Sequence, residues 1–265
     1  MHLPLHQVDA FADAVFAGNP AAVVPLERWL PDTLMQAIAA ENNLAETAFT
    51  VPAGDAWELR WFTPAVEVDL CGHATLAAAW VLANRVAPGR PTYRFLTRRA
   101  GELTVDVEGD LLTLDFPARP AVPATPHPGL ATALGAVPRA VLRAGANLLA
   151  VFETAEEVIA LAPRFADLPG PEGLSVIATA PGRDGVDFVS RYFAPALGID
   201  EDPVTGSAHC TLVPYWAARL GRDRLEARQV SRRGGALSCR LAGDRVRMTG
   251  RVAPYLEGRI TVPDG

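Results

Sequence analysis

The 265-residue sequence has few cysteines, no excess of positive charge and no long apolar run. Its three cysteines, Cys71, Cys210 and Cys239, are odd in number and lack metal-ligand spacing, which indicates a reducing compartment and no disulfide framework. The longest apolar run, residues 74–83, is far shorter than the ~20 residues of a membrane-spanning helix. No cationic segment followed by an apolar one opens the chain, so we expect a cytoplasmic protein without a signal peptide or a membrane partner.

The charge balance argues against a polyanionic partner. The chain has 24 Lys and Arg against 30 Asp and Glu, a net charge of −6. The basic pair at residues 232–233 is too short to track nucleic acid and is typical of a solvated turn. The hydrophobic fraction of 49% is that of a globular protein with enough apolar residues for two modest domains.

Two stretches of the chain repeat one another, and the rest is organised around them. Residues 60–65 read Arg-Trp-Phe-Thr-Pro-Ala, and residues 191–196 read Arg-Tyr-Phe-Ala-Pro-Ala. A glycine then opens an apolar helix pattern in each half, at Gly72 and at Gly206. Duplicated halves of this kind predict two similar domains with the candidate site in the cleft between them.

The boundary and the elements follow from composition and periodicity. Residues 117–128 hold five prolines and are the predicted linker without regular structure, which gives domains at 1–117 and 118–265 whose final strand can return to the first half. Strands are expected at 5–8, 21–24, 57–62, 93–96, 103–107, 111–116, 174–179, 186–193, 246–248 and 259–262. Helices are expected from Pro31, after each repeat glycine and after a capping box at Thr154, and Pro214 should kink the second repeat helix.

The two glycines are candidate substrate-binding positions. The first turn of each helix that follows Gly72 or Gly206 carries unpaired backbone N–H groups. Two such helix starts facing one cleft would hold a carboxylate and stabilise an enolate-like charge. A tight turn is the ordinary role of a glycine. Because the glycine is duplicated beside His73 and Ser207, a binding role is as well supported as a tight turn.

Four polar side chains near these turns are candidates for acid–base chemistry. Glu46 lies between an apolar helix and an apolar strand, where loss of solvation would make it a better base. The helix start at His73 disfavours the imidazolium and favours a neutral proton relay. Asp202 could orient that imidazole, and Ser207 could donate to substrate. Taken singly, each also fits a structural role: an exposed strand-edge carboxylate, a packing histidine, a turn-forming aspartate and a helix N-cap.

The order and spacing of these motifs resemble the PhzF-like isomerase family, within the diaminopimelate epimerase and proline racemase superfamily. The matching segments cover nearly the whole chain: Asp9-Ala10-Phe11, residues 18–23, residues 43–49, Phe62-Thr63-Pro64, residues 71–76 and residues 201–208. The resemblance implies an α+β fold of the diaminopimelate epimerase type, with two pseudo-symmetric domains, each a barrel-like sheet around a central helix. It also implies a homodimer.

The resemblance further implies proton transfer without a cofactor or metal, on a small anionic metabolite bound between the domains. Carried over by position, Glu46 is the family's acid/base carboxylate, and His73, Asp202 and Ser207 are its other catalytic residues. Substrate-selecting groups are expected on loops near Asn19, Pro64 and residues 231–235. The substrate itself stays open, with a biosynthetic reaction like that of the family's phenazine precursor as one candidate.

The superfamily's racemases use two cysteines, and this chain departs from that pattern. Cys71 stands just before Gly72, where the first would be, but Val204 takes the corresponding place in the second loop and cannot exchange a proton. An isomerase with Glu46 as its acid/base group is the favoured function. The alternatives are an epimerase or racemase of a small amino or hydroxy acid, with Glu46 and a low-pKa Cys71 as its two bases, and a non-catalytic ligand-binding relative.

Overall fold

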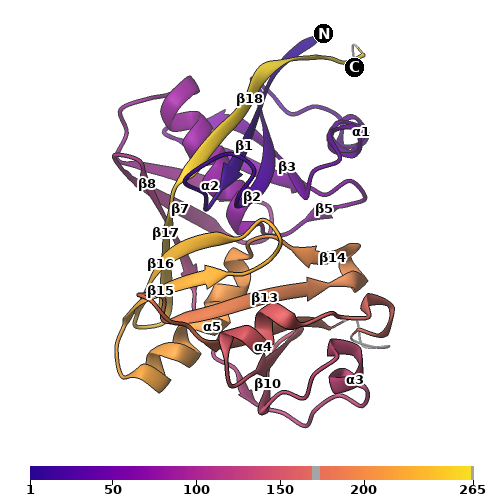
Figure 1. The fold of residues 1–265 in the computed structure, drawn as a ribbon. Helices are drawn as coiled ribbons and strands as arrows, with labels where there is room; N and C mark the ends of the chain where they lie inside the picture. The colour runs from indigo at the N-terminus through magenta and orange to yellow at the C-terminus, as the bar shows by residue number, and fades with distance from the viewer. Residues whose placement is uncertain (169–173, 264–265) are drawn as a thin grey trace. The chain divides into compact units, whose positions relative to one another are not determined.

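The computed structural model describes residues 1–168 and 174–263, and the chain divides into two compact units (Figure 1). The first unit consists of Met1–Asp115 with Thr249–Gly265, and the second of Phe116–Met248. Both contain helices and a mixed β-sheet, so the expected α+β class is confirmed. Within the described ranges, no helix is long and apolar enough to cross a bilayer.

The first unit wraps its strands around one helix. Its strands are β1 (His2–Ala10), β2 (Asn19–Pro25), β3 (Glu46–Ala53), β4 (Ala56–Phe62), β5 (Glu67–Val68), β6 (Thr92–Thr97), β7 (Glu102–Glu108), β8 (Leu111–Pro117) and β18 (Val252–Thr261). Its helices are α1 (Asp32–Asn42) and α2 (Gly72–Val81), the latter continued by the π-helical turn η1 (Leu82–Val86). Strand β1 pairs with β18 and with β2, both antiparallel. The C-terminal strand therefore belongs to the same unit as the N-terminal one.

The second unit contains its own strands and a long helix. The strands are β9 (Val122–Pro123), β10 (Ala140–Ala144), β11 (Asn147–Val151), β12 (Ser175–Pro181), β13 (Phe188–Ala194), β14 (Ile199–Asp202), β15 (Arg224–Gln229), β16 (Gly235–Ala242) and β17 (Arg245–Gly250). The helices are α3 (Leu130–Leu134), α4 (Ala155–Ala160) and α5 (Gly206–Leu220), with 3₁₀ turns η2 (Phe165–Asp167) and η3 (Pro195–Leu197).

The two units repeat one order of strand pairing. In the first, β2 and β3 are parallel, β3 and β4 antiparallel, β4 and β5 antiparallel, β4 and β6 parallel, and β6 and β7 antiparallel. In the second, β11 to β16 follow the same sequence of parallel and antiparallel pairs. Helix α2 follows β5 as helix α5 follows β14. The internal repeat seen in the sequence is thus a repeat of structure.

The repeat extends to individual side chains. Arg60 donates from Nε and Nη2 to the Glu67 carboxylate, at 2.7 Å each, and Arg191 donates from the same atoms to Glu201 at 2.7 and 2.9 Å. Each guanidinium also lies 5.0 Å from an aromatic ring two residues further along its strand, Phe62 or Phe193. Bidentate pairing and ring contact fix these arginines in both units, which anchors the strand that leads toward each central helix.

Small side chains place α2 at the centre of its unit. Nine of its ten residues are buried, most of them alanine or another small residue, and the helix contacts β1, β2, β3, β7 and β18. A helix that is apolar on all sides is stable only when surrounded. Strand β3 contacts both α1 and α2, and its first six residues are buried on both faces. That position takes Glu46, the first residue of β3, out of solvent.

One local expectation needs correction. The proline-rich stretch 117–128 is not wholly irregular, because β9 pairs antiparallel with Arg143 and Leu142 of β10. Proline can occupy such a strand edge because it needs no N–H there. Pro214 does lie within α5, which continues to Leu220; the kink expected there stays a prediction.

Candidate active site

The predicted site residues fall into two groups, one in each unit. Asn19 begins β2, Glu46 begins β3, and Gly72 and His73 are the first two residues of α2. In the second unit Asp202 ends β14, and Gly206 and Ser207 are the first two residues of α5. His73 and Ser207 therefore hold equivalent helix positions. The meeting of both groups in one cleft stays a prediction.

In the first unit, His73 bridges the other polar side chains. Its Nε2 lies 3.1 Å from Oε2 of Glu46. Its Nδ1 lies 3.0 Å from Nδ2 of Asn19 and 3.5 Å from Sγ of Cys71. All four residues are buried, with Glu46 only 8% exposed. Burial removes the interpretation of Glu46 as an exposed strand-edge carboxylate.

The charge on Glu46 governs the imidazole beside it. Burial acts to lower the pKa of His73, the anionic forms of Cys71 and Glu46 act to raise it, and the net direction is upward from the ordinary value. The expectation of a neutral imidazole set by the helix start is therefore wrong. The helix start disfavours the imidazolium, but the charges of Cys71 and of Glu46, whose carboxylate lies 3.1 Å away, act in the opposite direction.

The alternative in which Cys71 has a low pKa is also wrong. Burial, and then the charge of Glu46, raise the pKa of Cys71 to about 11. Cys71 is the N-cap residue of α2, yet enclosure in an apolar setting outweighs the favourable helix start. Cys71 is thus a neutral thiol at neutral pH.

Asn19 can serve either protonation state of the imidazole. With a neutral ring that carries its proton on Nε2, the Asn19 amide donates to Nδ1. With an imidazolium, the same amide turned by half a rotation accepts from Nδ1–H through its oxygen. His73 can therefore gain or lose a proton at Nδ1 while its Nε2 keeps facing Glu46.

Glu46, Cys71 and His73 are also residue types that bind metal ions, and one ligand atom from each lies within 4.8 Å of the other two. The sulfur, however, approaches Nδ1 while the carboxylate approaches Nε2. A histidine binds a metal through one nitrogen, and here the partners are divided between the two. The geometry favours a chain of polar contacts through the imidazole over a metal centre.

In the second unit, Thr205 is the centre of the polar contacts near Asp202. Its hydroxyl donates to Oδ2 of Asp202, and its carbonyl oxygen lies 2.8 Å from Nδ1 of His209. Gln229 joins them by accepting from the Thr205 backbone N–H at 2.9 Å and donating to the Asp202 carbonyl at 2.7 Å. All four residues are buried.

Thr205 corrects the predicted register of the second loop. It directly precedes Gly206 and is the N-cap residue of α5, as Cys71 is of α2, so Thr205 rather than Val204 is the counterpart of Cys71. Ser207 is the second residue of the helix, and so the N-cap interpretation of Ser207 is wrong. Counting back from each glycine would have found Thr205. Gln229 lies on another strand, and no sequence signal pointed to it.

A turn anchored by a hydroxyl occurs in each unit and holds two arginines, Arg98 and Arg99 in the first unit and Arg232 and Arg233 in the second. Thr97 Oγ1 accepts from Ala100 N at 2.9 Å, and Ser231 Oγ accepts from Gly234 N at 3.0 Å. Ser231 also donates to the carbonyl of Pro203 at 2.7 Å. The loop at 231–235, predicted to select substrate, is thus tied to the residue next to Asp202.

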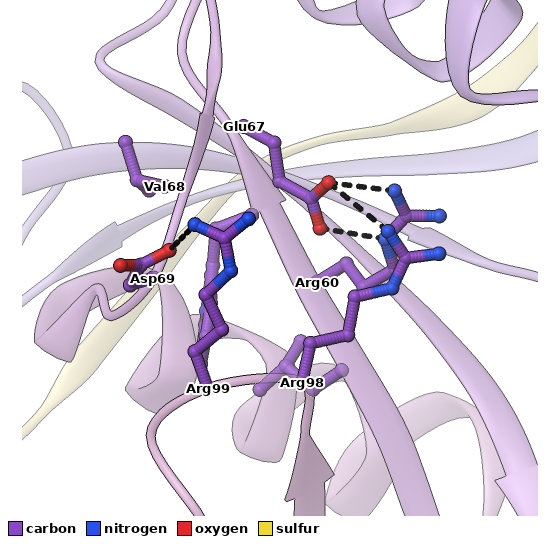
Figure 2. Close-up of a pocket in the computed structure, with 8 residues that line it drawn as sticks. Arg60, Glu67, Val68, Asp69, Arg98 and Arg99 are labelled. Atoms are coloured by element: carbon purple, nitrogen blue, oxygen red, sulfur yellow. Dashed lines mark hydrogen bonds and ion pairs between the residues drawn. The ribbon is translucent and has the colours of Figure 1, made fainter.

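Arg98 and Arg99 line a pocket beside β5 together with Arg60, as Figure 2 shows. Arg60 and Arg98 both reach Glu67, and Arg99 reaches Asp69 at 2.9 Å. Each of the three guanidinium groups therefore has a carboxylate partner. This charge pairing gives the pocket a structural role in holding the segment that leads to α2.

Proteins similar to this chain include two that are named as isomerases. The chain is 52% identical over 260 residues to an uncharacterized isomerase of Pseudomonas aeruginosa, covering 98% of this chain and 99% of that protein. It is 40% identical over 264 residues to an uncharacterized isomerase of Halalkalibacterium halodurans, covering 98% and 99%. These relationships support a general isomerase role.

The family itself follows from two further matches. The family model described as phenazine biosynthesis-like protein matches residues 8–258. The crystal structure of a PhzF-family phenazine biosynthesis protein from Enterococcus faecalis is similar with a TM-score of 0.92 and 46% identity, over 99% of this chain and all of the other. The chain belongs to the phenazine biosynthesis-like, or PhzF, family. A predicted epimerase of Pseudomonas aeruginosa, at 22% identity and a TM-score of 0.74, shares the fold, which is the expected diaminopimelate epimerase type.

Proposed function

We propose that the protein is an isomerase that moves a proton within a small carboxylate-bearing metabolite, with Glu46 as general acid and base. The observation that carries the proposal is the contact of the buried Glu46 carboxylate with His73 at the start of α2. A buried carboxylate beside an imidazole can take a proton from a carbon acid and return it. The chain itself supplies the base, its partner and backbone donors.

In the proposed reaction, Glu46 removes a proton from a carbon that is acidified by conjugation with the substrate carboxylate. The electron pair of the broken C–H bond moves into the conjugated system, and backbone N–H groups at Gly72 and His73 stabilise the resulting enolate-like charge. The protonated Glu46 then returns the proton to a different carbon. The substrate is isomerised, and no electrons leave or enter it.

Three parts of the proposal are supported by family resemblance. Asp202 would supply or accept a proton, and Ser207 would donate a hydrogen bond to the substrate. The protein would act as a homodimer, and sedimentation velocity would then show one species of twice the 28.2 kDa chain mass. A monomer at working concentration would remove this part alone.

The second candidate is an epimerase that uses Glu46 and Cys71. The 3.5 Å contact between Sγ of Cys71 and Nδ1 of His73 favours it, because it links the thiol to the same imidazole as Glu46. The raised thiol pKa of about 11 weighs against it, because a thiolate base would be rare at neutral pH. Inversion at one carbon in heavy water, abolished in Cys71→Ser, would favour this candidate.

Hydrogen exchange in heavy water tests the main proposal. A panel of small carboxylates is incubated with the protein, and deuterium uptake and double-bond position are followed by NMR. Glu46→Gln keeps the side-chain shape and should reduce the exchange rate by about 100-fold or more. The matched control is Glu41→Gln, the same change at an exposed position on α1. Near-normal exchange by Glu46→Gln would refute the role of Glu46.

A further inference from the structure

Gln229, Thr205 and Asp202 form a chain of hydrogen bonds in the second unit. Gln229 Nε2 lies 3.1 Å from the Thr205 hydroxyl oxygen and 2.7 Å from the carbonyl oxygen of Asp202. Oε1 of Gln229 lies 2.9 Å from the Thr205 backbone nitrogen. The Thr205 hydroxyl in turn bonds to Oδ2 of Asp202. Gln229 is fully buried, and the other two residues are nearly so.

The donor and acceptor properties of these groups allow one arrangement of the protons in the chain, which we call the proton order. A backbone N–H can only donate and a backbone carbonyl can only accept, so Oε1 of Gln229 must face Thr205 N and its amide N–H₂ must face Asp202 O. The same amide nitrogen then donates to the Thr205 oxygen. A hydroxyl carries a single proton, and with its oxygen already accepting from Gln229, that proton is directed to Oδ2 of Asp202.

From this order we infer that Thr205 and Gln229 are positioning residues, which hold the Asp202 side chain as an ionised carboxylate whose Oδ2 accepts from the Thr205 hydroxyl. If Oδ2 of Asp202 were protonated, its O–H and the Thr205 hydroxyl would be two donors facing each other. The role of Asp202 in catalysis rests on the proposed function, whereas the proton order does not.

His209 and Tyr192 also lie beside this chain of hydrogen bonds. The Thr205 carbonyl can only accept, so the proton of His209 lies on Nδ1, and the fully buried ring is neutral. Tyr192 of β13 lies opposite Asp202 in the strand register. Burial, and also the Asp202 charge, raise the pKa of its phenol, so Tyr192 is neutral as well. Neither residue adds a charge to Asp202 at neutral pH.

The first unit contains a related arrangement. The carbonyl of its N-cap residue, Cys71, accepts from Thr75 Oγ1 at 2.5 Å, as the Thr205 carbonyl accepts from His209 four residues further on. The N-cap side chain of each central helix then contacts a candidate acid–base group of its own unit: Cys71 contacts His73, and Thr205 contacts Asp202. Only the second unit places a hydroxyl donor there.

NMR titration of the protein labelled with ¹³C at the aspartate carboxyls tests the inference without any substrate. Thr205→Val removes the donor and should increase the proton affinity of Asp202 about tenfold or more, as expected for one hydrogen bond to a charged group. Thr205→Ser should restore the wild-type titration. The matched control is Thr211→Val on the same helix, whose buried hydroxyl has no hydrogen-bond partner among the described residues.

An Asp202 titration that is the same in wild type, Thr205→Val and Thr211→Val would overturn the inference. Where Thr205→Val does not fold, the wild-type Thr205 hydroxyl proton gives a second measurement. It should exchange slowly with water and shift as Asp202 titrates, and fast exchange without such a shift would also overturn the inference. Neither measurement depends on catalysis. The inference about Asp202 can therefore fail while the proposed role of Glu46 is supported, and the role of Glu46 can fail while the inference about Asp202 is supported.

Discussion

Oε2 of Glu46 and Nε2 of His73 lie 3.1 Å apart, and both side chains are buried. The Glu46 charge acts in the same direction on two neighbours, since it raises the pKa of His73 and that of Cys71. A buried carboxylate that controls both groups gives the first unit one electrostatic centre. Removing that charge should therefore change two measurable titrations.

The Cys71 thiol should become more acidic in Glu46→Gln. In the wild type its pKa is about 11, and loss of the carboxylate removes the second of the two effects that raise it. We expect iodoacetamide to alkylate Cys71 severalfold faster in Glu46→Gln at pH 9, measured by mass spectrometry of the peptide that contains Cys71. Glu41→Gln is the control. Equal rates in the variant and the wild type would contradict the assignment of Glu46 as the controlling charge.

His73 should stabilise the fold most at acidic to neutral pH. Its folded-state pKa is raised, so its stabilising contribution is fully present below the ordinary pKa of 6.5 and is lost as pH rises through the higher folded value. Urea denaturation of wild type and His73→Gln should show a difference in the free energy of unfolding that is larger at pH 6 than at pH 9. A difference that is constant across this range would show that the imidazole does not gain a proton in the folded state.

The architecture could be predicted from sequence because its signals are local. Arg60 and Arg191 occupy matching places in matching strand and turn patterns, and those patterns do not depend on tertiary contacts. The glycines that open α2 and α5 were found in the same way, whereas the α+β class came from the resemblance to the family. Segments of this kind fold alike because the same spacing dictates the same strand, turn and helix.

The chemistry of the site could not be predicted in full, because it depends on neighbours that are distant in sequence. Glu46 reaches His73 only because β3 and α2 pack together, and the pKa directions of His73 and Cys71 follow from that contact. Gln229 contacts Thr205 from a different strand. Arguments from the helix start gave the wrong direction for the pKa of His73 and of Cys71, because burial and nearby charges are larger effects.

His209 should make the fold sensitive to acid. Burial lowers the pKa of this fully buried imidazole to about 4, from 6.5. Below pH 6.5 the unfolded chain takes up a proton that the folded chain does not, so stability is lost as pH falls from 6.5 toward 4. Between pH 7 and pH 5 this amounts to about 2 kcal/mol. His209→Gln should remove that part of the slope in urea denaturation, whereas His2→Gln at an exposed position should not. An unchanged slope in His209→Gln would show that His209 is not the residue responsible.

Gly18 should be irreplaceable for a reason beyond its backbone angle. Both Gly18 and Gly54 have left-handed backbones, with φ of +64° and +66°. A Cβ on Gly18 would lie 2.3 Å from the carbonyl oxygen of Ala10 and 2.7 Å from Cβ of Ala12, whereas nothing lies within 4 Å of one on Gly54. Gly54→Ala should cost about 1–2 kcal/mol, the penalty of the left-handed conformation alone.

Gly18→Ala should cost about 1–3 kcal/mol more than Gly54→Ala, because rigid backbone atoms must also move. The displaced residue next in the chain is Asn19, which contacts Nδ1 of His73, so this variant should shift the NMR titration of His73 as well. Gly54→Ala should leave that titration unchanged. Denaturation in urea measures the first effect and ¹⁵N-imidazole NMR the second. Equal stability losses in the two variants, with the His73 titration unmoved, would mean that the turn before Asn19 can adjust and does not position the imidazole.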